Sequence, residues 1–391
     1  MSRQVRPLDV FIVAGEESGD QLGFKLMRAL RQETQDAVTF RGVGGPAMTR
    51  AGLDSLFPLS DIAVMGFLPV IARLGPLLRR IAQTADAIVA NPPDVLVIID
   101  SPDFTHRVAK RVRKALPGLA VVDYVSPSVW AWRPGRAPAM RAYVDHVLAL
   151  LPFEPRAHQE LGGPACTYVG HPLVERLAEL RPDAQEAAAR DASPPTVLIL
   201  PGSRRAEISR LMPIFADTLA RVDAACGPAD YVLPAVDHLE SSIREMTAAW
   251  PVKPRIVLGE AEKWKAFRRA RAALAASGTV TLELALSGVP MVAGYRVRAI
   301  EAAFIRAVIR INTVLLPNLI LDNQAVPEFL QEDCTPENMA PALIALLRGG
   351  PERDAQAAEL ARLGRIMTLD GESPSQRAAR IVLSAAKSKA G

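Results

Sequence analysis

The chain has 391 residues, of which 49% are hydrophobic, 23% charged and 5% aromatic, and its formal net charge is +4. Two domains are expected at this length, and the composition is that of an ordinary globular protein. Because the few aromatic residues are not interleaved with a basic tract, no nucleic acid partner is predicted. The widely spaced Cys166, Cys226 and Cys334 lack metal-ligand spacing, which is typical of reduced thiols in a cytoplasmic protein. We expect neither a signal peptide nor a membrane span, since no apolar run reaches roughly 18 residues.

Short apolar segments alternate with helical patterns, which is typical of βα units around a parallel sheet. The predicted strands of the first half are Val10–Val13, Val38–Phe40, Val95–Ile99, Leu119–Val122, Val144–Ala149 and Thr167–Val169. After the polar stretch Arg181–Pro195, further strands are predicted at Val197–Leu200, Tyr231–Leu233, Ile256–Leu258, Ala272–Ala275 and Pro290–Val292. The pattern predicts an α/β protein with two Rossmann-like domains, 1–180 and 181–365, facing each other across a cleft, and a helical tail at 366–391.

The apolar run Val95–Ile99 stops abruptly at two carboxylates, Asp100 and Asp103. The run predicts a strand buried on both faces, and ligands of open α/β sheets bind outside the carboxyl ends of the strands. Asp100 could therefore accept a proton from a substrate. It could equally cap the following helix, and the local pattern leaves both interpretations open.

Two loops of the second half, at 201–204 and 276–279, predict a diphosphate site. Each loop runs from a predicted strand into the start of a helix, where free N–H groups favour anions. In the first loop, Arg204 adds a charged donor. Glu283 lies about one turn beyond the second loop, where its carboxylate could bind two ribose hydroxyls. The residues predicted to contact the ligand are Gly202, Ser203, Arg204, Ser277, Gly278, Thr279 and Glu283. Taken singly, each loop is also explained by an acid or an arginine at an ordinary helix start.

A third glycine-rich loop, Gly42–Ala47, matches G-x-G-x-x-A after a strand, and Asp61 follows at the distance of a ribose-binding acid. The match is weak, because the loop follows the second strand rather than the first. We therefore interpret the loop as a tight turn rather than as a dinucleotide site. The functional alternative is that the loop lies against a phosphate of the acceptor.

The segment Ile62–Gln83 is more apolar than a surface helix, and it contains arginines, glycines and prolines. It could form a pair of core helices or an interfacial membrane segment with basic side chains for anionic lipid. A second mixed run, Arg296–Ile311, strengthens the membrane interpretation. The predicted membrane contacts are Val64, Met65, Phe67, Leu68, Val70, Ile71, Leu74, Leu77 and Leu78.

The loop Ser126–Arg133 holds Trp130 and Trp132, and two tryptophans beside arginines predict the wall of a binding site. On the acceptor side, the candidate residues are Ser18, Asp103, Trp132 and Arg133. His171 lies near the hinge that we predict between the two domains, at about 175–195, and a structural role is favoured over a catalytic one for this residue.

These motifs together resemble the lipid-A-disaccharide synthase family. The matching segments are 13–20, 124–133, 151–154, 170–172, 200–204, 277–279, 316–319 and 327–332, and the resemblance covers nearly the whole chain. The block Ser-Pro-Ser-Val-Trp-Ala-Trp at 126–132 is the most specific. The resemblance implies a GT-B fold and an inverting transfer in lipid A biosynthesis, in which UDP-2,3-diacylglucosamine and 2,3-diacylglucosamine 1-phosphate give a tetraacyl disaccharide 1-phosphate and UDP.

By this resemblance Asp100 is the general base, while Arg204, Glu283 and Asn318 contact UDP. It further implies contact with an anionic membrane surface, peripherally at the cytoplasmic face of the inner membrane of a Gram-negative bacterium. We expect no cofactor and no metal, and a homodimer stays open. The chain departs from the family at 322–324, where Asp-Asn-Gln stands in place of a frequent Gly-Arg-Glu, and at Ile300, where some members have an aromatic residue.

Three other functions stay open on the residues alone. A UDP-sugar 2-epimerase would share the phosphate loops but would not need the membrane segment. A non-catalytic lipid- or nucleotide-binding protein would leave Asp100 without a task. An NAD-dependent oxidoreductase rests only on Gly42–Ala47.

Overall fold

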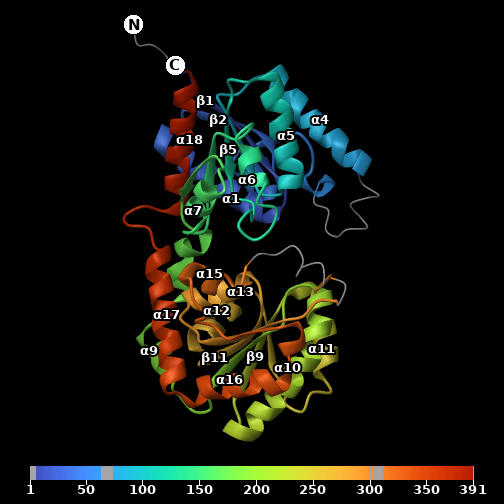
Figure 1. The fold of residues 1–391 in the computed structure, drawn as a ribbon, viewed down its shortest axis with the longest axis vertical. Coiled ribbons are helices and arrows are strands. Elements are labelled where there is room, and N and C mark those ends of the chain that lie inside the picture. The colour runs from blue at the N-terminus through green and yellow to red at the C-terminus, as the bar shows by residue number, and fades with distance from the viewer. Residues whose placement is uncertain (1–5, 63–73, 299–300, 303–310, 391) are drawn as a thin grey trace. The chain divides into compact units, whose positions relative to one another are not determined.

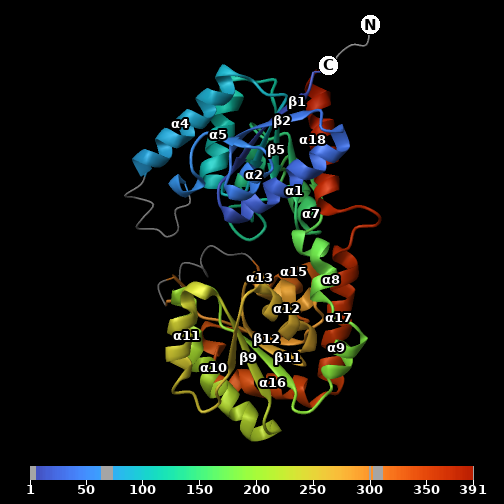
Figure 2. The same ribbon diagram turned by 180° about the vertical axis from the view of Figure 1, so that it is seen from behind.

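The computed structural model describes residues 6–62, 74–298, 301–302 and 311–390. The chain divides into two compact units, the first made of residues 1–172 and 369–391 and the second of residues 173–368 (Figures 1 and 2). Each unit is built on its own parallel sheet, with helices on both faces.

The first unit contains a seven-stranded sheet in the order β3-β2-β1-β4-β5-β6-β7. Its strands are β1 (Leu8–Ala14), β2 (Val38–Val43), β3 (Asp54–Ser55), β4 (Val95–Ile99), β5 (Ala120–Tyr124), β6 (His146–Ala149) and β7 (Ala165–Tyr168). Its helices are α1 (Glu17–Thr34), α2 (Pro46–Arg50), η1 (Leu59–Asp61), α4 (Leu74–Ala90), α5 (Pro102–Ala115), α6 (Arg136–Met140), α7 (Glu154–Glu160) and α18 (Pro374–Ala390).

The second unit contains a six-stranded sheet in the order β10-β9-β8-β11-β12-β13. Its strands are β8 (Thr196–Leu200), β9 (Asp230–Ala235), β10 (Arg255–Leu258), β11 (Ala272–Ala276), β12 (Met291–Tyr295) and β13 (Glu328–Leu330). Its longer helices are α10 (Arg205–Cys226), α11 (Glu240–Thr247), α12 (Glu260–Arg269), α13 (Thr279–Leu286), α16 (Pro336–Arg348) and α17 (Pro351–Met367). Shorter helices are η2 (Pro172–Arg176), α8 (Leu177–Leu180), α9 (Ala184–Ala189), η3 (Asp237–Leu239), α15 (Leu316–Leu321) and η4 (Gln331–Asp333).

All eleven predicted strands are confirmed, and β4 has the predicted bounds. The sequence analysis missed β3 and β13, which are two and three residues long and lie at the edges of their sheets. Neither strand has a buried residue, so neither has the apolar run that marks a strand in sequence. That the two domains face each other across a cleft stays a prediction.

Strand β4 is apolar at every position because it is buried on both faces of the sheet. Val95, Val97 and Ile99 pack into one core cluster of the first unit, while Leu96 and Ile98 pack into the cluster on the opposite face of the sheet. Helices α1 and α18 cover the first of these faces, and α18 lies directly against α1 (Figure 1). The C-terminal helix of the chain therefore completes the core of its own N-terminal unit.

The strand order places a topological switch point in each unit. In the first unit the chain passes from β1 to one side of the sheet and from β4 to the other, and β8 and β11 hold the same positions in the second unit. Ligands of such sheets bind where the strand order reverses, beyond the carboxyl ends of the strands. The loops after these four strands are therefore the first place to look for a functional site.

Backbone N–H donors of the loop Gly42–Ala47 and of the next residue are occupied by a side chain of the protein itself. The buried carboxylate of Asp20 accepts hydrogen bonds from the backbone N–H groups of Gly45, Ala47 and Met48, at 2.9, 2.9 and 3.0 Å. These are the donors that a dinucleotide or an acceptor phosphate would need. Both functional interpretations of this loop are therefore wrong, and the loop is a tight turn capped by an acid from α1.

Most of the predicted membrane contacts lie outside the described residues, namely Val64, Met65, Phe67, Leu68, Val70 and Ile71, as does the side chain of Leu74. At the two ends of the segment, Ile62 and Ile81 are buried in the core, whereas Leu78 is 46% exposed. Leu77 packs partly buried against the same core. No helix in the described part of the chain has both the length and the apolar character to cross a membrane.

Replacing Asp20 by Ala should destabilise the first unit by about 3 kcal/mol or more, because three buried N–H groups lose a charged acceptor. Urea denaturation measures this loss. The control is Glu17→Ala, which removes an exposed acid from the same first turn of α1. Equal unfolding midpoints for the two variants would contradict the capping role of Asp20.

Candidate active site

The switch point of the first unit brings Glu16, after β1, beside Asp100, after β4. The two loops touch closely, since a Cβ atom at Gly15 would come within 2.2 Å of the Cβ of Ser101. Only glycine fits position 15. This contact keeps the two loops, which carry Glu16 and Asp100, close to each other.

The backbone at Asp100 has an unusual conformation. Asp100 and Ser101 have φ angles of +53° and +43°, in the left-handed region that residues with a side chain rarely adopt. The turn is held by the Thr105 hydroxyl, which donates to the Asp100 carbonyl at 2.6 Å, and by the Ser101 N–H, which donates to the Asp100 carboxylate at 2.6 Å. Strained backbone of this kind is maintained by its surroundings and gathers at functional sites.

Burial, first, and then the neighbouring Glu16, by hydrogen bonding and by repulsion between like charges, together raise the pKa of Asp100 to about 6. The Ser101 N–H acts in the opposite direction but more weakly. A carboxylate with such a pKa is ionised at pH 7 and is a stronger base than an exposed aspartate. Ser18 also belongs to this group, because its hydroxyl donates to Glu16 at 2.7 Å.

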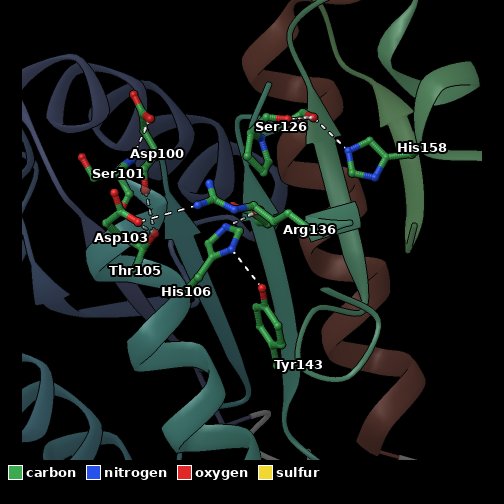
Figure 3. A network of polar contacts seen from close by, with 11 residues as sticks. Asp100, Ser101, Asp103, Thr105, His106, Ser126, Arg136, Tyr143 and His158 are labelled. Carbon is green, nitrogen blue, oxygen red and sulfur yellow. Dashed lines mark hydrogen bonds and ion pairs between the residues drawn. The ribbon is translucent and has the colours of Figure 1, made fainter. Parts of the chain in front are cut away.

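A second polar group lies along α5, after Asp100 (Figure 3). Asp103 forms an ion pair with Arg136 at 3.6 Å, and the buried His106 contacts Tyr143 through Nδ1 at 3.1 Å and Asp123 through Nε2 at 3.0 Å. Burial raises the pKa of Tyr143 to about 12, so its hydroxyl stays protonated.

The two tryptophans of the loop at 126–133 have different tasks. Trp130 donates from Nε1 to the fully buried Glu154, whose pKa burial raises to about 7, and packs edge-on against Phe153. Trp132 instead carries the guanidinium of Arg133 over its ring at 4.3 Å. Of the two tryptophans predicted to form the wall of a binding site, Trp130 therefore holds the loop in place. Trp132 instead orients Arg133, close to the polar group on α5.

His171 follows β7, and burial lowers its pKa to about 4. Its imidazole is therefore uncharged at neutral pH, which agrees with the structural role favoured from sequence.

The switch point of the second unit holds a pocket of about 750 Å³. All seven residues predicted for the diphosphate site line it, together with residues beyond β9 and at the start of α12. Gly278, with φ of +155°, opens helix α13, and the first N–H groups of that helix have no helical acceptor. The geometry therefore agrees with an anion site at this helix start.

The charged side chains of the pocket pair with one another. Arg204 pairs with Glu207 at 2.9 Å, and Lys263 pairs with Glu283 at 2.5 Å. A third acid, Glu260, pairs with Arg176 at 2.5 Å. Asp237 also lines the pocket, so its carboxylates outnumber its lysine and arginine side chains, and the affinity for an anion has to come mainly from the N–H groups at the starts of α10 and α13.

The structure places Asn318 outside the residues that line this pocket. Its buried amide bonds both backbone groups of Val326, at 2.9 and 3.0 Å, and so closes the loop after α15. In the segment that departs from the family, Asn323 bonds Glu359 at 2.9 Å. Ile300 lies outside the described residues.

The sequence analysis missed Lys263 and the stretch 234–238, which also line the pocket. No local motif marks Lys263, which lies inside an ordinary helical pattern. The available signal is topological: the carboxyl ends of all parallel strands meet at one edge, so the residues after β9 and β10 belong to the same site.

Two doubly wound units, with a nucleotide-sized pocket at the switch point of the second, form the architecture of the GT-B fold class. Solved structures of similar fold include MurG from Acinetobacter baumannii, with a TM-score of 0.59 and 15% identity over 97% of this chain and 100% of that chain. Another is a UDP-GlcNAc 2-epimerase from Neisseria meningitidis bound to UDP-GlcNAc, with a TM-score of 0.59 and 10% identity over 96% and 99%. At these identities the likeness shows the fold alone.

Sequence relatives define the family. The family model described as lipid-A-disaccharide synthetase matches residues 10–381. The lipid-A-disaccharide synthase of Nitrobacter hamburgensis is 58% identical over 96% of this chain and 94% of its own length. That of Bradyrhizobium diazoefficiens is 55% identical over 96% and 95%. The chain belongs to the lipid-A-disaccharide synthase family and is a UDP-sugar-dependent glycosyltransferase of lipid A biosynthesis. The 2-epimerase and the NAD-dependent oxidoreductase are thereby set aside.

Replacing Glu16 by Gln should move the acidic limb of the kcat/KM profile to lower pH by roughly one unit. The variant removes a like charge beside Asp100, so the pKa of Asp100 falls, although burial still holds it above the ordinary value. The measurement is transfer between pH 4.5 and 8. Glu17→Gln, an exposed neighbour, should leave the limb near pH 6. An unshifted limb in Glu16→Gln would show that the two carboxyl groups do not interact.

Proposed function

We propose that the enzyme transfers 2,3-diacylglucosamine from UDP to the C6 hydroxyl of 2,3-diacylglucosamine 1-phosphate, with inversion at the anomeric carbon. The observation that carries this proposal is the Asp100 carboxyl group at the switch point of the first unit, with its pKa raised to about 6. The products are a tetraacyl disaccharide 1-phosphate and UDP.

In this mechanism Asp100 acts as the general base. As the C6 oxygen attacks the anomeric carbon, its proton passes to the Asp100 carboxylate, and the bond from the anomeric carbon to the diphosphate breaks. General base catalysis of this kind contributes about 10²–10⁴-fold. The acceptor hydroxyl, held by the first unit, has to reach the sugar of the donor, held by the second.

The leaving UDP gathers negative charge, which the pocket of the second unit can stabilise. Backbone N–H groups at Ser203 and at the Gly278 loop would bind the diphosphate, since prearranged dipoles at a helix start lower the energy of a developing anion. Glu283 would accept hydrogen bonds from the ribose hydroxyls. Its ion pair with Lys263 fixes the orientation of that carboxylate.

Both substrates carry acyl chains, so the enzyme has to take them from a lipid surface. Exposed Leu78, at the start of α4, and the apolar segment that precedes it support contact with a membrane. We propose peripheral attachment to an anionic membrane on its cytoplasmic side, through this segment.

Asp100→Asn should abolish transfer while UDP binds with unchanged affinity. The measurements are UDP release with both acylated substrates present, compared with each alone, and calorimetry with UDP. Because the raised pKa makes the ionised carboxylate destabilising above pH 6, the variant should also be more stable than wild type at pH 8, by about 2 kcal/mol, a gain that fades as the pH falls towards 4. Turnover near that of wild type would remove Asp100 from the mechanism.

Lys263→Met should weaken UDP binding by about tenfold, because Glu283 loses the partner that orients it. The matched control is Lys265→Met on the same helix, where the lysine is exposed and pairs with Glu262 at 3.9 Å. Calorimetry with UDP compares the two. If both variants bind UDP as wild type does, the ribose is held by other groups.

A further inference from the structure

A basic pocket of about 500 Å³ lies along helix α5 in the first unit, and the proposed mechanism has not used it. Its α5 residues include Asp103, Arg107 and Lys110, which face one side of the helix because they are spaced by three and four positions. Arg133 and Arg136, from the loop and helix beyond β5, line the pocket opposite them.

The charge of this pocket is unbalanced. Arg136 pairs with Asp103 at 3.6 Å, and the side chain of Asp103 is 81% exposed. Within the described ranges, no carboxylate pairs with Arg107, Lys110 or Arg133. Three cations thus converge on one pocket without a carboxylate partner, whereas carboxylates outnumber lysine and arginine side chains in the pocket of the second unit.

Aromatic rings hold two of these cations without neutralising them. Arg133 stacks over Trp132 at 4.3 Å, and the ammonium group of Lys110 lies over the ring of Tyr143 at 4.9 Å. A cation–π contact orients a side chain but leaves its N–H groups free to bind an anion. Tyr143 is itself fixed by His106, so the pocket is organised before a ligand arrives (Figure 3).

The position of the pocket identifies its ligand. Pro102 and Asp103 line it, and they lie two and three residues after Asp100 in the chain, so the pocket begins close to the proposed base. The acceptor carries both groups on one sugar: the phosphate is on C1, the attacking hydroxyl is on C6, and C1 and C5 (which bears C6) flank the ring oxygen. An acceptor bound at Asp100 through that hydroxyl therefore places a phosphate about one sugar ring away.

We propose that Arg107, Lys110 and Arg133 bind the 1-phosphate of the glycolipid acceptor. This inference rests on the proposed function. A phosphate monoester offers three oxygens and up to two negative charges, which suits arginine forks and a lysine in a partly enclosed pocket. The site thereby selects the phosphorylated glycolipid over its unphosphorylated form.

Membrane phospholipids carry the same chemistry as phosphate diesters, and the test separates the two sources. The double variant Arg107→Ala/Lys110→Ala is assayed in neutral detergent micelles, with the donor saturating, against diacylglucosamine 1-phosphate and against diacylglucosamine. The kcat/KM for the phosphorylated acceptor should fall about 10- to 100-fold. For the unphosphorylated acceptor it should stay within about twofold, and the affinity for UDP should not change.

The matched control is Lys114→Ala, an exposed lysine one turn further along the same helix that is not among the residues lining the pocket. It removes one positive charge and should leave both acceptors unaffected. An equal loss for both acceptors, or an equal loss in the control, would overturn the phosphate site. So would a double variant that loses only its attachment to phosphatidylglycerol vesicles and uses both acceptors normally, since the pocket would then bind headgroups.

A binding measurement separates this inference from the proposed function. Short-chain diacylglucosamine 1-phosphate is titrated by calorimetry into wild type and the double variant, without donor. Weaker binding by the variant supports the site even if wild type transfers nothing. Equal binding by both proteins, in an enzyme that transfers normally, leaves the proposed function standing and removes the phosphate site.

Discussion

The interaction on which the account depends is the burial of one carboxyl group, Asp100, beside a second one, Glu16. Taking a carboxylate out of water is costly unless it is paired with a cation, and here the nearest charged partner has the same sign. The fold maintains the pair because β1 and β4 are adjacent strands buried on both faces, and because Gly15 lets their loops touch. The same burial and repulsion that destabilise the ionised carboxylate raise its pKa, and they thereby make Asp100 a stronger base at neutral pH.

The two units offer phosphate groups different environments. In the second unit, paired charges leave the binding of a diphosphate to backbone dipoles, which do not move and are already directed at the pocket. In the first unit, the pocket on α5 keeps unpaired cations on exposed side chains. The first arrangement suits a leaving group whose charge grows during the reaction. The second suits a group that only has to be recognised.

Local pattern was enough to predict the eleven longer strands, the alternation that makes both sheets parallel, and the glycine-rich loops that line the pocket of the second unit. It predicted Asp100 as a candidate site residue because a fully buried strand ends there, and ligands of open α/β sheets bind beyond the carboxyl ends of such strands. What sequence did not predict depends on contacts between distant residues. Asp20 fills the loop at 42–47 from helix α1, Glu16 meets Asp100 across two strands, and Lys263 reaches Glu283 from a neighbouring helix. Asn318 is a different case. Its polar side chain was expected to contact the ligand, but in the structure it bonds the backbone of Val326 and closes a loop.

The most direct test of this account is the titration of the Asp100 carboxyl group itself, followed in the ligand-free enzyme by the carboxyl ¹³C resonance of labelled aspartate and assigned with Asp100→Asn. The account predicts a midpoint near pH 6. A single midpoint near pH 4 would show an ordinary exposed aspartate, and the proposed base would lose its physical foundation.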